Sequence, residues 1–236
     1  MQSKTRDLLA RSWQSQANLS FFLFLLILMA FVLPSVRFEK NALVLYEDIG
    51  FSTISVVGAA IAWGNRRLFV LTSLVAIVAI LLRWASWWNP TNTLFLWSIS
   101  TGLGAILMLA AVLLWQVFRS GPVTVMRIQG AIAAYLCLGF GWAHAHNLAA
   151  LLDPDAFKAA GSNISFAISW VNYSFGMLTT VGYAGFVPVD PLAHTLGSAE
   201  AVTGQLYLAV LVARLVSMQV NAAGKRADAS LTGSSG

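Results

Sequence analysis

The chain has 236 residues, of which 58% are hydrophobic and only 10% are charged, and its formal net charge is +5. So few charged side chains cannot cover the surface of a soluble domain of this size, which excludes an ordinary soluble protein and predicts an integral membrane protein. The basic residues flank apolar runs, as the positive-inside rule of membrane proteins describes, and this pattern argues against nucleic acid as a partner.

Six apolar segments are expected to cross the membrane as helices, each approaching the ~20 residues needed to span a hydrocarbon core of ~30 Å. In chain order they cover residues 19–36, 48–63, 68–84, 93–118, 125–152 and 191–220. A further apolar segment, residues 164–178, is too short to cross and predicts a half-crossing. Six full crossings place both termini on the same side.

The basic residues predict which side that is, because loops alternate between the two sides of the membrane. Nine basic residues fall on the side of the termini and four on the other side. The nine are Lys4, Arg6, Arg11, Arg66, Arg67, Arg119, Arg127, Lys225 and Arg226. The positive-inside rule therefore predicts that both termini are cytoplasmic.

The most informative segment follows the half-crossing and reads Thr-Thr-Val-Gly-Tyr-Ala-Gly over residues 179–185. Backbone at membrane depth that is neither helix nor barrel must be buried in protein or line a water-filled cavity, so this segment predicts a pore or a pocket. Glycines allow successive carbonyl groups to point the same way through positive-φ conformations, and a threonine hydroxyl adds a further oxygen. Four copies around an axis replace the hydration shell of a cation. One chain holds one such segment, so a channel must be an oligomer, most simply a cyclic tetramer.

These residues resemble the selectivity filter of the tetrameric potassium-channel superfamily, whose signature is Thr-Val-Gly-Tyr-Gly. The matching residues are Thr180, Val181, Gly182 and Tyr183. The sequence departs at Ala184, where the family has its last glycine, and at Gly185, where an aspartate is usual. Gly204 matches the hinge glycine of the family's inner helix. The resemblance to a bacterial six-helix branch of this superfamily is specific over about residues 125–220 and only architectural over the first four helices.

The resemblance implies an all-α integral membrane protein with six transmembrane helices, a re-entrant pore helix and a filter, assembled as a fourfold-symmetric homotetramer. It implies passive, potassium-selective conduction across a bacterial inner membrane, with K+ as the permeant ion and no cofactor. The implied ion sites are Thr180, Val181, Gly182, Tyr183 and Ala184. The alternative, raised by Ala184-Gly185, is a weakly selective or non-selective cation channel. A transporter or a non-conducting scaffold is a further alternative, whereas no constellation of residues predicts an enzyme.

The resemblance also implies roles for the last helix. Gln205, Leu208 and Val212 share one helical face at i, i+3 and i+7, and this face would line the cavity below the filter. Gly204 would be the gating hinge. Gln205 has the alternative of facing lipid or a neighbouring subunit. Glu200 is expected to pair with a hydroxyl or amide of the pore helix, with a response to protonation as the alternative, because an unpaired charge in such a helix is expensive.

Ala184 is where the sequence and the implied function conflict. If this backbone keeps a positive φ, an alanine there costs roughly 1 kcal/mol or more per subunit. Gly185 lacks the side chain that ties the outer filter to the pore helix in many relatives, and Asn172 and Gly176 do not supply the usual partners. The outer filter is therefore expected to be loosely braced, unless neighbouring packing, such as Tyr183 against Tyr173, holds it.

The resemblance divides the chain into a cytoplasmic N-terminal segment (1–18), a four-helix domain (19–118), a linker (119–127), a pore domain (128–220) and a disordered tail (221–236). Residues 93–118 contain no arginine, so the fourth helix cannot act as a strong voltage sensor. The four-helix domain is either a structural skirt or a sensor of a ligand or lipid.

His144 and His146 are two residues apart and point to different faces, which makes a poor metal pair. Gly102, Gly104, Gly139 and Gly141 predict close helix packing.

Overall fold

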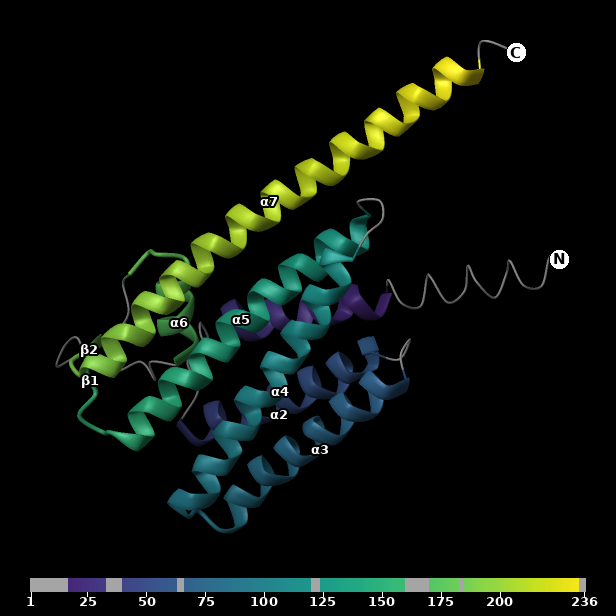
Figure 1. Cartoon of the computed structure of the whole chain (residues 1–236). Helices are drawn as coiled ribbons and strands as arrows, with labels where there is room; N and C mark the ends of the chain where they lie inside the picture. Colours follow the sequence, from purple (N-terminus) through teal and green to yellow (C-terminus); the bar gives the residue numbers. More distant parts are fainter. Residues whose placement is uncertain are drawn as a thin grey trace.

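The computed structural model describes residues 17–32, 40–62, 66–119, 124–159, 170–182 and 185–233. These residues form a bundle of long helices with a small two-stranded ribbon at one end (Figure 1). The first helix is Ala17–Val32, whose last turn is the π-helical η1 (Leu28–Val32). The helices that follow are α2 (Lys40–Ile61), α3 (Arg66–Trp88), α4 (Asn92–Phe118), α5 (Val125–Leu152), α6 (Trp170–Leu178) and α7 (Pro191–Gly233).

Four of these helices are long and apolar enough to cross a membrane: α3, α4, α5 and α7. The chain is therefore an all-α membrane protein in the part that the structure describes. The helix Ala17–Val32 is apolar but shorter, and α2 carries Glu47 and Asp48 within its length. Of the six predicted crossings, these two are not among the four.

The predicted boundaries agree closely for α4 and α5, where the sequence carries clear start signals. Thr91 caps α4 by accepting a hydrogen bond from Leu94 N–H, and Thr124 caps α5 by accepting one from Arg127 N–H. α2 begins eight residues earlier than its predicted start at residue 48, and α3 extends to Trp88 instead of residue 84. No proline interrupts either extension, so the backbone continues in helical geometry.

The last helix was expected to end at residue 220 and to be followed by a disordered tail, residues 221–236, whereas α7 continues unbroken to Gly233. The segment begins Asn-Ala-Ala-Gly-Lys-Arg-Ala, and alanine, lysine and arginine are strong helix formers that prolong a helix already begun. Gly224 is the single weak position in that run, and residues 234–236 lie outside the described residues.

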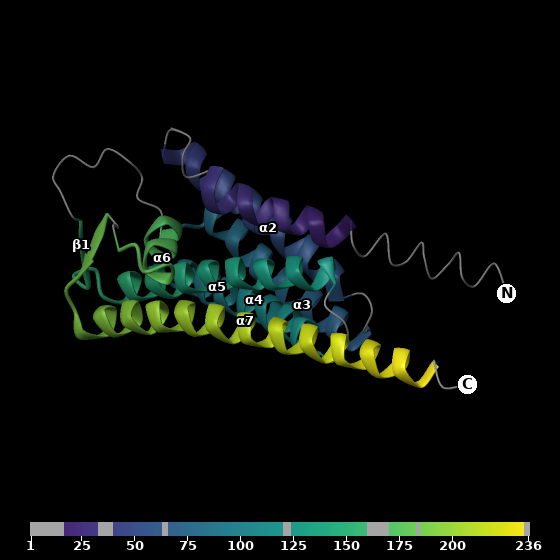
Figure 2. The same cartoon turned by 90° about the horizontal axis from the view of Figure 1, so that it is seen from above.

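The helices are arranged around α4 and α5. Figure 2 shows α5 between α7 on one side and the N-terminal helices on the other, and Figure 1 places α3 at the far edge from α7. Three of the four predicted packing glycines lie at close contacts. A Cβ atom at Gly102 would lie 3.1 Å from His144, one at Gly139 would lie 2.6 Å from Phe175, and one at Gly141 would lie 3.2 Å from Leu107. Gly104 faces open space.

The ribbon pairs a strand that follows α5 with a strand that precedes α7. β1 (Phe157–Ala159) and β2 (Phe186–Pro188) are antiparallel, with Lys158 opposite Val187. No strand is expected here from the sequence alone. Three-residue strands are too short to carry an alternating pattern that sequence reading could detect.

Candidate functional site

α6 occupies the position predicted for the re-entrant pore helix, between α5 and α7. Its nine residues, Trp170–Leu178, are a short helix, and the predicted earlier part, residues 164–169, lies outside the described residues. Tyr173, Ser174 and Leu178 are fully or almost fully buried. Buried side chains therefore anchor the helix in its middle and at its C-terminal end.

The chain turns sharply where α6 ends. Thr180 has a φ of 60° and Gly182 a φ of 78°, so two of three successive residues have left-handed backbone. Thr180 N–H donates to Met177 O at 2.9 Å, and Gly182 N–H donates to Gly176 O at 3.1 Å. A threonine in this conformation is strained, and the conformation persists only where the surrounding structure holds it. Such strain is typical of functional sites.

The sequence-predicted filter residues are described only in their first part. Thr180, Val181 and Gly182 follow α6 directly and are exposed in the single chain, with the Val181 side chain 52% exposed. Tyr183 and Ala184 lie outside the described residues, so the expectations about them stay predictions.

α7 lies directly against the end of α6. The Gln205 side-chain amide donates to Thr180 Oγ1 at 3.4 Å, which brings this predicted cavity residue next to the first predicted filter residue. Leu208 and Val212 are 44% and 59% exposed on the same helix. All three predicted cavity residues therefore lie on uncovered parts of α7 in the single chain.

Gly204, the predicted hinge, lies within a helix that shows no break. A Cβ atom at this position would lie 2.0 Å from the carbonyl oxygen of Leu178, the last residue of α6. That distance is far below any real contact, so only glycine permits the two helices to approach as they do. In this structure the glycine serves close packing, and its role as a hinge stays a prediction.

A buried polar cluster joins α5, α6 and α7 behind this junction. His146 and Glu200 have no exposed surface, and His146 Nε2 lies 2.7 Å from Glu200 Oε2. Ser174 of α6 lies between the other carboxyl oxygen of Glu200, at 2.5 Å, and the carbonyl oxygen of Gly139, at 2.6 Å. The predicted pairing of Glu200 with a hydroxyl is confirmed, and the hydroxyl is that of Ser174 in α6. Sequence reasoning missed His146, although a buried carboxyl at membrane depth requires such a partner.

Aromatic rings surround this buried cluster and continue to the ribbon. Tyr173 lies edge-on to His146 with ring centroids 4.8 Å apart. Trp170, at the start of α6, stacks on Phe186 of β2 with centroids 4.3 Å apart and planes 9° apart. Phe157 of β1 contacts both Trp170 and Tyr173. Offset and edge-on ring pairs of this kind stabilise packing by about 0.5–1.5 kcal/mol each beyond area burial.

Residues 186–190, which follow the predicted filter, are well held. They are fixed by the β1–β2 ribbon, by Val189 N–H donating to Ala156 O at 2.9 Å, and by the Phe186–Trp170 stack. Whether the outer filter itself is loosely braced or held by neighbouring packing stays a prediction, because Tyr183 and Ala184 lie outside the described residues.

The two histidines have different surroundings, as their two-residue spacing predicted. His144 Nδ1 donates to Phe140 O at 2.9 Å, and its ring lies 5.6 Å from that of Phe51, whereas His146 contacts Glu200. Within the described residues no group of three His, Cys, Asp or Glu side chains could hold a metal ion. Cys137 is buried and free.

Comparisons of the chain with protein-family models, with curated proteins and with solved structures found no match. Its chemistry therefore has to be read from its own residues. The site combines a short buried helix, left-handed backbone at its end, and a long helix packed against that turn.

Proposed function

We propose that the chain is one subunit of a homotetrameric, potassium-selective channel of a bacterial inner membrane. The observation that carries the proposal is the left-handed backbone of Thr180 and Gly182 directly after a nine-residue helix held between two long apolar helices. Irregular backbone at membrane depth needs protein or water around it. A filter strand, together with copies of itself, fulfils that need, and its Thr-Val-Gly-Tyr sequence matches the potassium-channel signature.

The exposure of α7 supports an oligomer. In the single chain only 6% of the most apolar stretch of α7 is buried, compared with 44% of the corresponding stretch in α4 and 50% in α5. Lipid covers part of such a helix, but Gln205 and the turn at Thr180 are polar and exposed on the same side. Polar groups next to a membrane-spanning helix require a water-filled or protein-covered environment, which the axis of a tetramer provides.

Voltage is not the expected stimulus of this channel. α4 contains no lysine or arginine between Asn92 and Phe118, so it has no charge that the membrane field could move. Both termini are expected in the cytoplasm. The departure at Ala184-Gly185 favours, as a second candidate, the same pore with weak selectivity among cations.

The test is reconstitution of the purified chain into liposomes with K+ inside and Na+ outside. A reversal potential near the K+ equilibrium value, with a tetrameric mass in detergent, is the expected result. A reversal potential near zero would replace selectivity with general cation conduction. A stable monomer, or no ion flux at all, would overturn the channel. Gly182→Ala should abolish flux because its φ of 78° disfavours a Cβ atom, whereas Gly104→Ala, in open space, should not.

A further inference from the structure

A cavity of about 510 Å³ lies between the N-terminal helices and the helices of the proposed pore. Its walls come from Ala17–Val32, α2, α3 and α4 on one side and from α5 and α6 on the other. Trp87, Pro90 and Phe95 place it at the end of the bundle where α3 passes into α4. Sites for small organic molecules in proteins have volumes of about 300–1,000 Å³, so this cavity is large enough for one.

Most of the cavity wall is apolar and aromatic. Phe51, Phe95, Ile99 and Phe140 come from three different helices and line it together. An apolar chain placed among them gains stabilisation in proportion to the area it buries. The apolar wall alone does not distinguish one hydrophobic ligand from another, so specificity depends on the polar groups at one end of the cavity.

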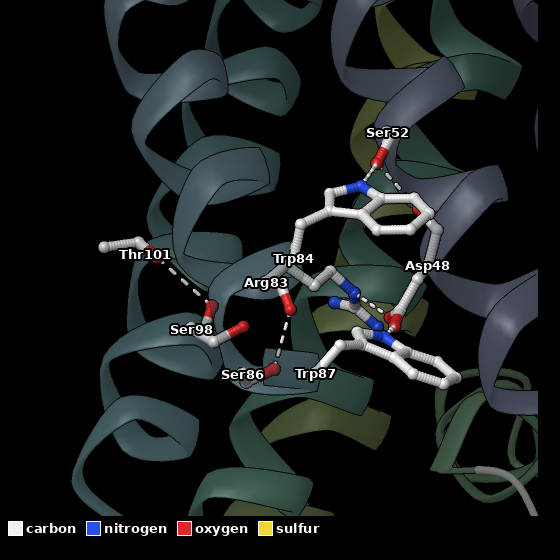
Figure 3. A network of polar contacts seen from close by, with 8 residues as sticks. All are labelled: Asp48, Ser52, Arg83, Trp84, Ser86, Trp87, Ser98 and Thr101. Carbon is white, nitrogen blue, oxygen red and sulfur yellow. Dashed lines mark hydrogen bonds and ion pairs between the residues drawn. The ribbon is translucent and has the colours of Figure 1, made fainter. Parts of the chain in front are cut away.

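At that end Asp48 and Arg83 neutralise each other. Figure 3 shows the Asp48 carboxylate between the side chains of Arg83 and Trp87. Arg83 Nε donates to one carboxylate oxygen, and Trp87 Nε1 donates to the other at 2.6 Å. The Arg83 guanidinium also lies over the Phe51 ring, 4.7 Å from its centroid. Both oxygens of Asp48 are thus occupied, and the cation of Arg83 is already paired.

Glu47, the next residue along α2, also lines the cavity. Among the side chains that the structure describes, it has no hydrogen-bond partner and no ion-pair partner within 4.0 Å. Burial raises the pKa of the Glu47 carboxyl, and the nearby Arg83 guanidinium opposes that rise. When Glu47 is ionised, this end of the cavity has a net charge of −1, because Asp48 and Arg83 cancel each other. A carboxylate beside an apolar wall attracts a cation and repels an anionic head group.

We propose that the cavity binds an amphiphile with an ammonium head group, the head against Glu47 and the apolar chain among the phenylalanine rings. A free organic amine and a membrane lipid with an ammonium head supply the same chemistry. Trp170 and Val171, the first residues of α6, form part of the wall, so the occupant contacts the proposed pore helix. Trp170 in turn stacks on Phe186, which follows the filter. Occupation therefore regulates conduction, a consequence that rests on the proposed channel function.

The binding test uses the full chain in nanodiscs of anionic and neutral lipids without an ammonium head group. Dodecyltrimethylammonium, dodecyl sulfate and dodecanol are titrated, and tryptophan fluorescence reports binding because Trp87 and Trp170 line the cavity. We expect dodecyltrimethylammonium to bind at least tenfold more tightly than dodecyl sulfate. Glu47→Gln should remove that preference while leaving dodecanol binding unchanged. The matched control is Asp155→Asn, which removes the same charge from an exposed position away from the cavity and should retain the preference.

Equal affinity for the two charged amphiphiles, or an unchanged preference in Glu47→Gln, would overturn the proposal. Native mass spectrometry of protein reconstituted with phosphatidylethanolamine distinguishes the two sources. A lipid adduct on the wild type that Glu47→Gln loses indicates a membrane lipid, whereas an adduct-free protein that binds dodecyltrimethylammonium indicates a soluble amine.

Ion flux separates this proposal from the proposed function. Dodecyltrimethylammonium applied from the side of the cavity should change K+ flux at least threefold in the wild type and not in Glu47→Gln. Charge-selective binding without any ion flux under any condition would overturn the channel and leave the site intact. Flux that ignores the bound amphiphile would overturn the regulatory step.

Discussion

The hydroxyl of Ser174 lies within hydrogen-bond distance of two oxygen atoms at once, one of the Glu200 carboxyl and the carbonyl oxygen of Gly139. A serine hydroxyl has one proton to donate. Both contacts are made together only when the Glu200 oxygen facing Ser174 carries a proton and donates it to Ser174. His146 Nδ1 has no partner among the described residues, which fits a neutral ring donating through Nε2 to the other carboxyl oxygen.

Glu200→Gln and Glu200→Ala should therefore differ sharply. The amide introduced by Glu200→Gln donates to Ser174 and accepts from His146, so the unfolding temperature should stay within a few degrees of the wild type. Glu200→Ala leaves the buried Nε2–H of His146 without a partner, at a cost of about 1–3 kcal/mol, whereas Ser174 keeps its hydrogen bond to Gly139 O. Thermal unfolding of the detergent-solubilised protein measures both. If the two variants lose equal stability, the carboxyl is ionised and its charge matters more than its hydrogen bonds.

Gly204→Ala should displace α7 from the end of α6. The added methyl group would lie 2.0 Å from Leu178 O and 3.0 Å from its carbonyl carbon, and backbone atoms cannot move aside as a flexible side chain does. Overpacking of this kind costs typically 1–3 kcal/mol. K+ flux should fall together with the unfolding temperature, because Thr180 follows directly after the displaced contact.

Gly104→Ala is the matched control for that substitution. Gly104 also lies in a membrane helix, but nothing lies within 4 Å of the position of its added Cβ atom. Alanine is the better helix former by about 1 kcal/mol, so stability should be unchanged or higher. Equal behaviour of the two variants would show that α7 and α6 are not held as closely as the distance to Leu178 implies.

Phe186→Ala should release the segment that follows the filter. The ring stacks on Trp170 at 4.3 Å and lies 6.0 Å from Tyr173, so its loss removes both contacts. The ring contacts contribute about 0.5–1.5 kcal/mol each. Hydrogen exchange of the amides of residues 186, 187 and 189 should accelerate, and the K+ flux should decay faster with time. Val187→Ala changes the neighbouring residue, whose side chain is 49% exposed, and should leave both measurements near the wild type.

Ala184→Gly tests the departure from the filter signature. If position 184 needs a positive φ, glycine relieves a strain of ~1 kcal/mol per subunit, and four subunits together shift a conducting equilibrium substantially. The variant should conduct K+ better and gain more thermal stability from high K+ than the parent. A companion change, Gly185→Asp, should help less, because Gly176 offers no partner side chain. Unchanged flux and unchanged K+-dependent stability in Ala184→Gly would mean that alanine is accommodated without strain.

The helices were predictable where the sequence contains both an apolar run and a terminal signal. α5 was predicted to its observed residues from the Ser-Gly-Pro breaker that precedes it, and in the structure Thr124 caps its start. The end of α7 was missed because polar residues after a membrane helix are compatible with either disorder or a continuing helix. Single-sequence reading cannot choose between them when no proline or glycine pair stops the helix.

The sequence identified functional residues that are close together along the chain, but it did not identify which residues far apart in sequence contact one another. Thr180 to Gly182 were identifiable from their motif, and the hydroxyl partner of Glu200 was predictable from the cost of an unpaired charge. His146 and Glu200 are 54 residues apart, and Asp48 and Arg83 are 35 apart. Each is a charged or polar residue in a largely apolar helix, a signal that predicts pairing but does not identify the partner.

Because α7 is long, a small tilt displaces its C-terminal end much more than the part that contacts α6. Its 43 residues measure about 65 Å at ~1.5 Å per residue, roughly twice the thickness of a ~30 Å hydrocarbon core. The contact between Gly204 and Leu178 lies near one end, so about 44 Å of helix extends from that contact to Gly233. A tilt of ~5° about this fulcrum moves the far end by about 4 Å while the residues beside Thr180 shift by a small fraction of that. A displacement of α7 near Gly233 is therefore reduced to a much smaller displacement at the turn after α6.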